Sequence, residues 1–384
     1  MPRQTHLRLT LARACAWGLL LAGWVGIGSL ALQFAPSMAG AFGLVALWLL
    51  ALGGAAALAT RGSIGRLSRA LALGVAALAS IAGLWLSLHG AGLPGLALAL
   101  LGWAALTALA SGVVRSLRLN QSATPTPPVA AASLGALGAG LALGDPGDLG
   151  ALALRLSGFV AVTALALVLL QRRIDPHRRA PGCRAGLFDC SLPAWPAGAW
   201  RDLQQWPTLL AGLAMLPMMA ALPLMAAWCR AQSLAPQAMV ALHLAAMFGP
   251  ALAFQRVIAT WSARTLAIAC AALLTAGAAS AAWVPAPLDG LGLAACHGAA
   301  WGLAWAGQLW APERRGSQGA SPWRAAAGYA LVTLAFGAVV QTWGLRGVAG
   351  VHIGLGLAAA VSLTLHLALT SADTDKPTTR LEGP

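Results

Sequence analysis

Long apolar segments, each followed by a short stretch that carries arginine, recur along the whole 384-residue chain. A helix needs about 20 apolar residues to cross the hydrocarbon core of a bilayer. We divided the sequence at its charges, prolines and polar clusters. This gives twelve candidate spans, at 14–34, 39–59, 70–88, 94–114, 127–144, 150–170, 208–228, 236–255, 265–284, 288–310, 323–343 and 348–370. The pattern predicts an all-α integral membrane protein.

The composition agrees with a chain surrounded by lipid. Only 9% of the residues are charged and 59% are hydrophobic, whereas a soluble domain carries roughly 25% charged residues. Too few polar groups are present to cover a surface that faces water. The net charge of +14 could suggest a nucleic-acid partner, but the arginines alternate with apolar segments instead of clustering. We therefore expect the basic residues to set membrane topology, and we expect no nucleic-acid partner.

The positive charges predict the orientation of the twelve spans. If the N-terminus is cytoplasmic and the spans alternate, all of the 24 basic residues fall on the cytoplasmic side except Arg155, Arg230 and Arg346. Cytoplasmic loops of membrane proteins carry such an excess of Lys and Arg. The protein is expected in the inner (plasma) membrane with both termini in the cytoplasm. Trp17 and Trp283 lie near predicted span ends, where tryptophans anchor a helix at the interface.

The longest connection lies at the midpoint and divides the chain into two equal parts. We expect an N-terminal six-helix bundle at 1–170, a cytoplasmic central loop at 171–207 and a C-terminal six-helix bundle at 208–370. The polar tail at 371–384 is expected to be disordered. The fifth span is short and rich in Gly and Ala, which favours close contact with another helix over exposure to lipid.

Two loop sequences resemble the signature of the major facilitator superfamily (MFS). LATRGSIGRLSR, at 58–69, follows the second span, and FGPALAFQRVIATWSAR, at 248–264, ends the eighth. At the end of the eighth helix, bacterial members of the family often have the sequence His-x-x-x-Met-Phe-x-Pro. Thr60 and Ala259 stand where the family has aspartate. The matching residues of the second pattern are His243, Met247, Phe248 and Pro250, and the expected gating-loop residues are Arg61, Gly65, Arg66, Arg256 and Arg264.

The resemblance implies a central cavity lined by helices one, four, seven and ten. On helix ten, His297, Trp301 and Trp305 follow one another at four-residue intervals and so share a face. Such a cavity would be aromatic, rich in thioethers and nearly uncharged, which suits a small apolar or amphipathic solute. The same spacing is also typical of simple helix packing. The candidate substrate-binding residues are Trp24, Trp103, Thr107, Met218, His297, Trp301 and Trp305.

Other kinds of chemistry find little support in the sequence. The acidic residues fall in predicted loops or tails, with Asp289 at the very start of the span 288–310. No carboxylate is therefore expected in the middle of the membrane, and His297 is the best candidate if transport is coupled to protons. His352 and His366 share one helix about 21 Å apart and cannot hold one metal ion. His243 is expected to bond a neighbouring helix. The six cysteines are scattered and no phosphate-binding loop occurs. We expect no enzyme, no cofactor and no metal site.

Two functions remain open from the sequence. The first is a secondary transporter that moves its solute by alternating access, working as a monomer in the bilayer. The second is a non-transporting membrane scaffold or assembly factor built on an MFS-like fold. The aspartates that Thr60 and Ala259 replace in the two signature loops favour the second.

Overall fold

The computed structural model describes residues 2–61, 66–119, 128–143, 148–171, 206–214, 229, 232–258, 260–310 and 322–374. Every regular element within these ranges is a helix. In chain order the labelled elements are α1 (Pro2–Phe34), α2 (Met38–Arg61), α3 (Arg66–Leu86), the π-helix η1 (Ser87–Ala91), α4 (Gly92–Leu119), α5 (Pro128–Leu143), α6 (Leu149–Gln171), α8 (Pro236–Ala253), α9 (Gln255–Ile258), α10 (Ala263–Trp283), α11 (Leu288–Trp310) and α12 (Pro322–Thr374). Residues 206–214 are helical as well.

The predicted spans agree with these helices, with one exception. Most of 208–228 lies outside the described residues, so the count of twelve stays a prediction. The last two predicted spans both fall in α12, which bends at Gly344. The φ of Gly344 is 56°, a left-handed conformation that glycine adopts without a steric penalty. The bend therefore lies between the two segments that the sequence separates.

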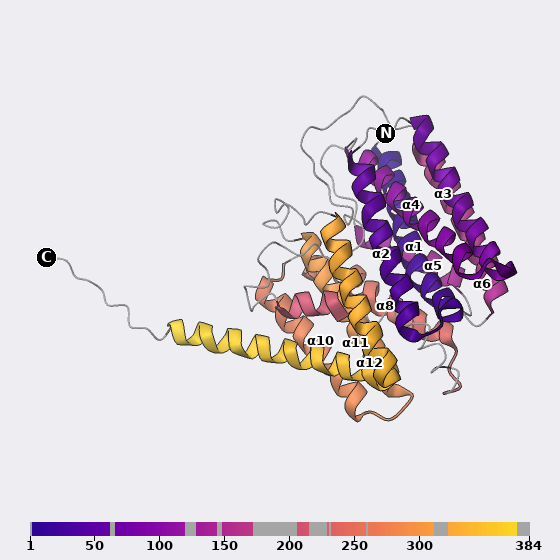
Figure 1. The fold of residues 1–384 in the computed structure, drawn as a ribbon. Coiled ribbons are helices and arrows are strands. Elements are labelled where there is room, and N and C mark those ends of the chain that lie inside the picture. The colour runs from indigo at the N-terminus through magenta and orange to yellow at the C-terminus, as the bar shows by residue number, and fades with distance from the viewer. Residues whose placement is uncertain are drawn as a thin grey trace.

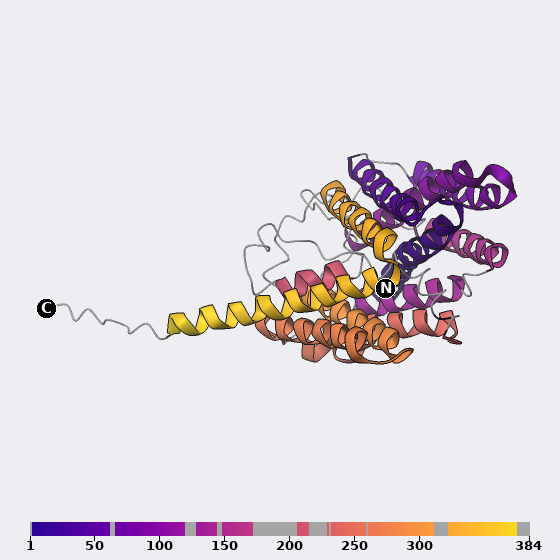
Figure 2. The same ribbon diagram turned by 60° about the horizontal axis from the view of Figure 1, so that its bottom comes forward.

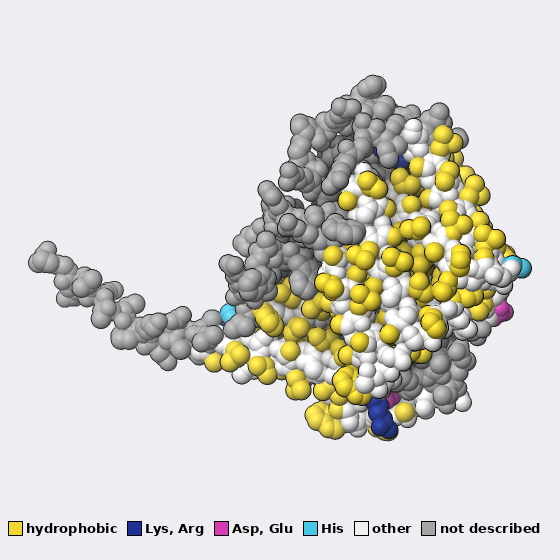
Figure 3. Space-filling model, viewed as in Figure 1, with side chains coloured by type: hydrophobic (Ala, Val, Ile, Leu, Met, Phe, Trp, Pro, Cys, Tyr) yellow, Lys and Arg dark blue, Asp and Glu magenta, His cyan; other side chains and the backbone are white. Residues whose placement is uncertain are grey.

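Seven helical stretches are long and apolar enough to cross a membrane: His6–Phe34, Met38–Leu58, Ser68–Val114, Leu149–Gln171, Ala263–Trp283, Ala326–Gly344 and Arg346–Ala368. The third contains both α3 and α4, which η1 joins into a hairpin through positive φ values at Gly90 and Gly92. Leucine and valine side chains on many helices face outward, and Figure 3 shows hydrophobic side chains spread over the described part of one face with few charged groups among them. The protein is a multi-pass membrane protein.

The helices gather into two groups that pack against each other (Figures 1 and 2). We call α1–α6 the N-terminal half and α8–α12 the C-terminal half. α1 contacts α2, α4, α5 and α6, while α11 contacts both α8 and α10. The halves meet where α2 packs along α12 and where α5 packs on α8. One continuous cluster of buried apolar residues has members in both halves.

Small residues let the helices of the N-terminal half approach closely. A Cβ at Gly135 of α5 would lie 2.5 Å from the backbone oxygen of Ala14 and 2.8 Å from the nitrogen of Gly18, both on α1. Real side chains never approach so closely, so α5 can take this position only with glycine there. The prediction that the Gly- and Ala-rich fifth span packs against another helix is confirmed.

Gly23 permits a hydrogen bond that fixes α4 on α1. The indole Nε1 of Trp103 donates to the backbone oxygen of Leu19 over 2.7 Å, and a Cβ at Gly23 would lie 2.5 Å from that Nε1. We expect Gly23→Ala to push Trp103 away and to lower the free energy of unfolding by about 1–3 kcal/mol, the usual cost of overpacking. Thermal unfolding of the purified protein measures this.

Gly43→Ala on α2 is the matched control, because a Cβ there meets nothing within 4 Å. Alanine is the better helix former, so this variant is expected to unfold at the wild-type temperature or slightly above it. Equal unfolding temperatures for the two variants would show that the Trp103 contact does not hold the helices together.

Candidate functional site

An aromatic cluster joins the two halves. It consists of Trp17 on α1, Phe248 on α8, and Trp301 and Trp305 on α11. The Trp17 ring centroid lies 5.2 Å from that of Trp305, 5.9 Å from Phe248 and 6.1 Å from Trp301, each in an edge-to-face arrangement. Trp301 and Trp305 stack on each other at 5.7 Å. All four side chains are buried, so one residue of the N-terminal half touches three rings of the other.

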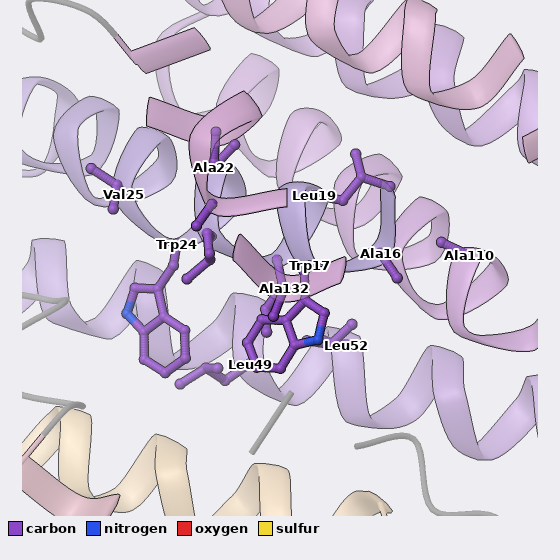
Figure 4. Packing of buried hydrophobic residues seen from close by; sticks show 14 of the residues in the cluster. Ala16, Trp17, Leu19, Ala22, Trp24, Val25, Leu49, Leu52, Ala110 and Ala132 are labelled. Atoms are coloured by element: carbon purple, nitrogen blue, oxygen red, sulfur yellow. The ribbon is translucent and has the colours of Figure 1, made fainter. Parts of the chain in front are cut away.

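Trp24 lies two helical turns beyond Trp17 on α1, and Figure 4 shows both rings on the same side of that helix. Its ring packs edge-to-face on Trp48 of α2 at 6.0 Å. The indole nitrogens of Trp24, Trp48 and Trp301 are buried without a hydrogen-bond partner among the described residues. A buried indole N–H usually finds an acceptor. These three groups are therefore donors available to an acceptor from outside the described chain.

The two candidates on α4 are already engaged within the N-terminal half. Trp103 donates its indole N–H to Leu19 of α1. The Thr107 hydroxyl donates to the backbone oxygen of Trp103 over 2.8 Å. Both side chains are buried. Their polar groups are thus satisfied by the protein, and their evident role is to position α4 against α1.

The three candidates on α11 do not act together. Trp301 and Trp305 contact α1 and α8 through the aromatic cluster. The His297 ring instead packs on His352 of α12, with centroids 4.3 Å apart. A Cβ at Gly277 of α10 would lie 2.6 Å from the Cδ2 of His297. The predicted shared face of α11 therefore divides between the contact with the N-terminal half and the interior of the C-terminal half.

A second contact between the halves lies at a different level. Phe42 near the start of α2 packs edge-to-face on Phe336 of α12, with centroids 5.6 Å apart. Close by, the backbone N–H of Ala39 donates to the Gln341 side chain over 3.2 Å. Because α2 returns antiparallel to α1, Phe42 lies well along the axis from Trp17. We call the interface between the two halves the seam. It contains aromatic contacts at two separate levels, one at Trp17 and one at Phe42.

The expected gating-loop residues are only partly described. Gly65 lies outside the described residues, as do the side chains of Arg61 and Arg66 and the whole of Met218. Arg256 on α9 and Arg264 at the start of α10 are exposed. Between them, the Ser262 hydroxyl caps α10 by accepting the backbone N–H of Thr265 over 3.1 Å. The two arginines therefore flank a tightly capped turn and are free to meet polar surroundings.

Some residues of the site were missed in the sequence. The prediction that Trp17 anchors a helix at the interface is wrong, because its side chain is only 1% exposed and lies in the seam. Trp283, by contrast, is 82% exposed. The spacing of seven between Trp17 and Trp24 was the available signal for a shared helix face. The prediction that His243 bonds a neighbouring helix is confirmed, since its Nδ1 lies 2.8 Å from the backbone oxygen of Ala294 on α11.

Comparison with known proteins identifies the fold. No known family profile matches the chain, and no curated protein sequence matches it. A mutant of the nucleoside transporter NupG is similar in structure, with a TM-score of 0.64, 15% identity, and coverage of 95% of this chain and 99% of that one. The POT family transporter PepTSo gives a TM-score of 0.53, again at 15% identity, covering 98% and 99%. The chain shares its fold with solved membrane transporters.

Proposed function

We propose that the chain is a secondary transporter of the major facilitator superfamily. It moves a small apolar or amphipathic solute by alternating access, with two six-helix bundles rocking about a site between them. The observation that carries this proposal is the aromatic cluster across the seam, where Trp17 meets Phe248, Trp301 and Trp305. In the same proposal the carrier is a monomer in the inner membrane with both termini in the cytoplasm.

The strength of the seam suits a contact that opens and closes. An edge-to-face aromatic pair contributes about 0.5–1.5 kcal/mol beyond the area that it buries. Trp17 makes three such pairs with the C-terminal half, so they amount to a few kcal/mol at most. A ligand shifts a two-state equilibrium by amounts of this size when it binds one state more tightly. These ring pairs therefore add a contribution that solute binding can offset.

The chemistry of the buried residues indicates the kind of solute. The buried side chains among the described residues include no Asp or Glu. A cation would therefore find no counter-charge there. The rings of Trp24, Trp301 and Trp305 offer apolar surface, and the indole N–H groups of Trp24 and Trp301 offer hydrogen-bond donors. These features favour a solute with an apolar body and at least one hydrogen-bond acceptor, and Met218 is proposed as a further contact.

A scaffold or assembly factor is the second candidate. Two observations favour it: Thr60 and Ala259 replace the loop aspartates, and the hydrogen bonds of Trp103 and Thr107 are used within the protein. A scaffold needs only stable packing, whereas a carrier must move solute. Co-purification of a stoichiometric partner, together with no flux in a broad uptake screen of the folded protein, would favour this function over transport.

Replacing Trp301 should slow transport strongly. A screen of metabolite mixtures on reconstituted protein first identifies a solute by mass spectrometry of the vesicle contents. Trp301→Ala removes an edge contact to Trp17 and a donor facing the seam, and we expect its initial rate to fall about tenfold or more, as for a loss of about 1.4 kcal/mol. Trp283→Ala removes an exposed ring of the same size and should stay within about twofold of wild type. Equal rates for both variants would contradict the proposal.

Gly337 should be needed for α2 and α12 to pack closely at the Phe42–Phe336 level of the seam. A Cβ at Gly337 would lie 2.5 Å from the Cβ of Phe42, so Gly337→Leu should hold α12 away from α2. We expect maximal turnover to fall severalfold while solute affinity changes little, because the wedge lies away from the tryptophans proposed to bind solute. Gly350→Leu lies on the same helix where a Cβ meets nothing within 4 Å, and its turnover should match wild type. Normal turnover in Gly337→Leu would show that this contact need not re-form.

A further inference from the structure

Three histidines from three helices meet inside the C-terminal half, away from the aromatic cluster. His243 comes from α8, His297 from α11, and His352 from the part of α12 beyond Gly344. All three side chains are at most 2% exposed. The rings of His297 and His352 pack edge-to-face at 4.3 Å. His243 packs on the next residue of α11, where a Cβ at Gly298 would lie 3.2 Å from its Nδ1. We call these residues the histidine cluster.

Hydrogen bonding fixes one protonation site in this cluster. The Nδ1 of His243 lies 2.8 Å from the backbone oxygen of Ala294. A carbonyl oxygen only accepts, so the proton must be on Nδ1, which donates it. In the neutral ring, Nε2 is then a bare acceptor, and it has no partner among the described residues. His243 is thereby held with a basic nitrogen in an apolar interior.

The other two rings leave the cluster with more acceptors than donors. All four ring nitrogens of His297 and His352 lack a hydrogen-bond partner among the described residues. Each neutral ring supplies one N–H and one bare nitrogen. Together with the Nε2 of His243, the cluster therefore holds three acceptors for two donors. Whatever pairs the rings form among themselves, one lone pair remains for an added donor or a cation.

Among the described side chains of the C-terminal half, no Asp, Glu, Lys or Arg is buried to balance a cation in this closed packing. α8 carries no titratable group besides His243. α10 contributes Gly277 beside His297 and the Cys270 thiol, which donates to the backbone oxygen of Ala300. Cys296 lies beside Gly277 as well, because a Cβ there would be 3.2 Å from the Cys296 Cβ. The other titratable side chains described on α10, α11 and α12 are Arg264, Asp289, Tyr329, Arg346 and His366. Asp289 precedes His297 by eight residues, about 12 Å along α11.

We propose that the histidine cluster is a proton site linked to opening of the C-terminal half. In the dry packing seen here the rings are neutral, since an isolated charge is disfavoured in apolar surroundings. When the helices separate and water enters, the cluster takes up about one proton. A proton needs only one lone pair, and no group of three or more His, Cys, Asp or Glu among the described residues is placed to hold a metal ion. The use of this proton to drive transport rests on the proposed carrier function, whereas proton-linked opening does not.

The sign of the linkage follows from the two states. An imidazole in water has an ordinary pKa of about 6.5. Above that pH the open state binds no extra proton, and the closed packing is fully favoured. Below it the open state gains a proton that the closed state lacks, so the open population rises by up to about tenfold per pH unit for each proton taken up. Acid should therefore open the cluster.

Hydrogen–deuterium exchange of the full-length protein in nanodiscs tests this. Exchange is measured at about pH 7.5 and about pH 5.5, on either side of the ordinary imidazole pKa of about 6.5, and corrected for the intrinsic rate. We expect protection in α11 and in α12 beyond Gly344 to fall about tenfold or more at the lower pH, while α1 stays protected. His243→Asn keeps an N–H for Ala294 but removes the basic Nε2, and this variant should lose most of the acid effect.

His89→Asn is the matched control. The exposed His89 on η1 makes the same kind of bond, with its Nδ1 2.8 Å from the backbone oxygen of Trp85, and this variant should keep the wild-type acid effect. Protection that is independent of pH in the wild type would overturn the proposal. So would an equal loss in α1, because that would be general acid unfolding.

A spectroscopic measurement covers the case in which His243→Asn fails to fold. Nitrogen-15 NMR of ring-labelled histidine distinguishes neutral from doubly protonated rings in the wild type, and His352→Gln identifies the signals of the cluster. One ring of the cluster should become doubly protonated as α11 opens. Rings that all stay neutral in the opened protein would overturn the proposal, as would a stoichiometric transition metal in the purified wild type that His352→Gln lacks. Neither result depends on finding a transported solute.

Discussion

Close packing between the two halves is the constraint on which the rest of the architecture depends. α2 lies along α12, α5 lies on α8, and aromatic rings meet between the halves. A backbone N–H crosses between the halves, from Ala39 to the Gln341 side chain. Helices in lipid otherwise satisfy their own backbone hydrogen bonds, so side chains provide most of the contact between one helix group and another. At the seam these side chains are Trp17 on one side and Phe248, Trp301 and Trp305 on the other. Rings attract through many weak contacts that are lost and regained without exposing a buried charge. A seam of this kind suits the opening and closing that the proposed transport would require.

The helices were predictable because the signal for a membrane span is local. A run of about 20 apolar residues needs no knowledge of the rest of the fold, and every predicted span except 208–228 coincides with a described helix. The error at Trp17 has a physical reason. The first predicted span begins at residue 14, whereas α1 begins at Pro2, so Trp17 lies deep in the helix rather than at its end. The polar residues before residue 14 made this helix look shorter in the sequence than it is.

The candidate site was less predictable because it depends on which helices become neighbours. Steps of four residues turn the face of a helix by about 40° each. Over the eight residues from His297 to Trp305 this is enough to move from the interior of one half to the seam. The histidine cluster draws on α8, α11 and α12, and no spacing within one helix predicts such a meeting. Trp103 illustrates the opposite case, in which a plausible cavity residue is used in packing.

The bend at Gly344 divides α12 into two arms with different neighbours. The part before Gly344 carries Phe336 against the N-terminal half. The part after it carries His352 and packs on α10, where the Thr275 hydroxyl donates to the backbone oxygen of Gly356 over 3.5 Å. The two arms thus meet at Gly344, whose positive φ suits glycine. Gly344 is therefore the residue that separates, within one helical element, the contact between the halves from the surroundings of the histidine cluster.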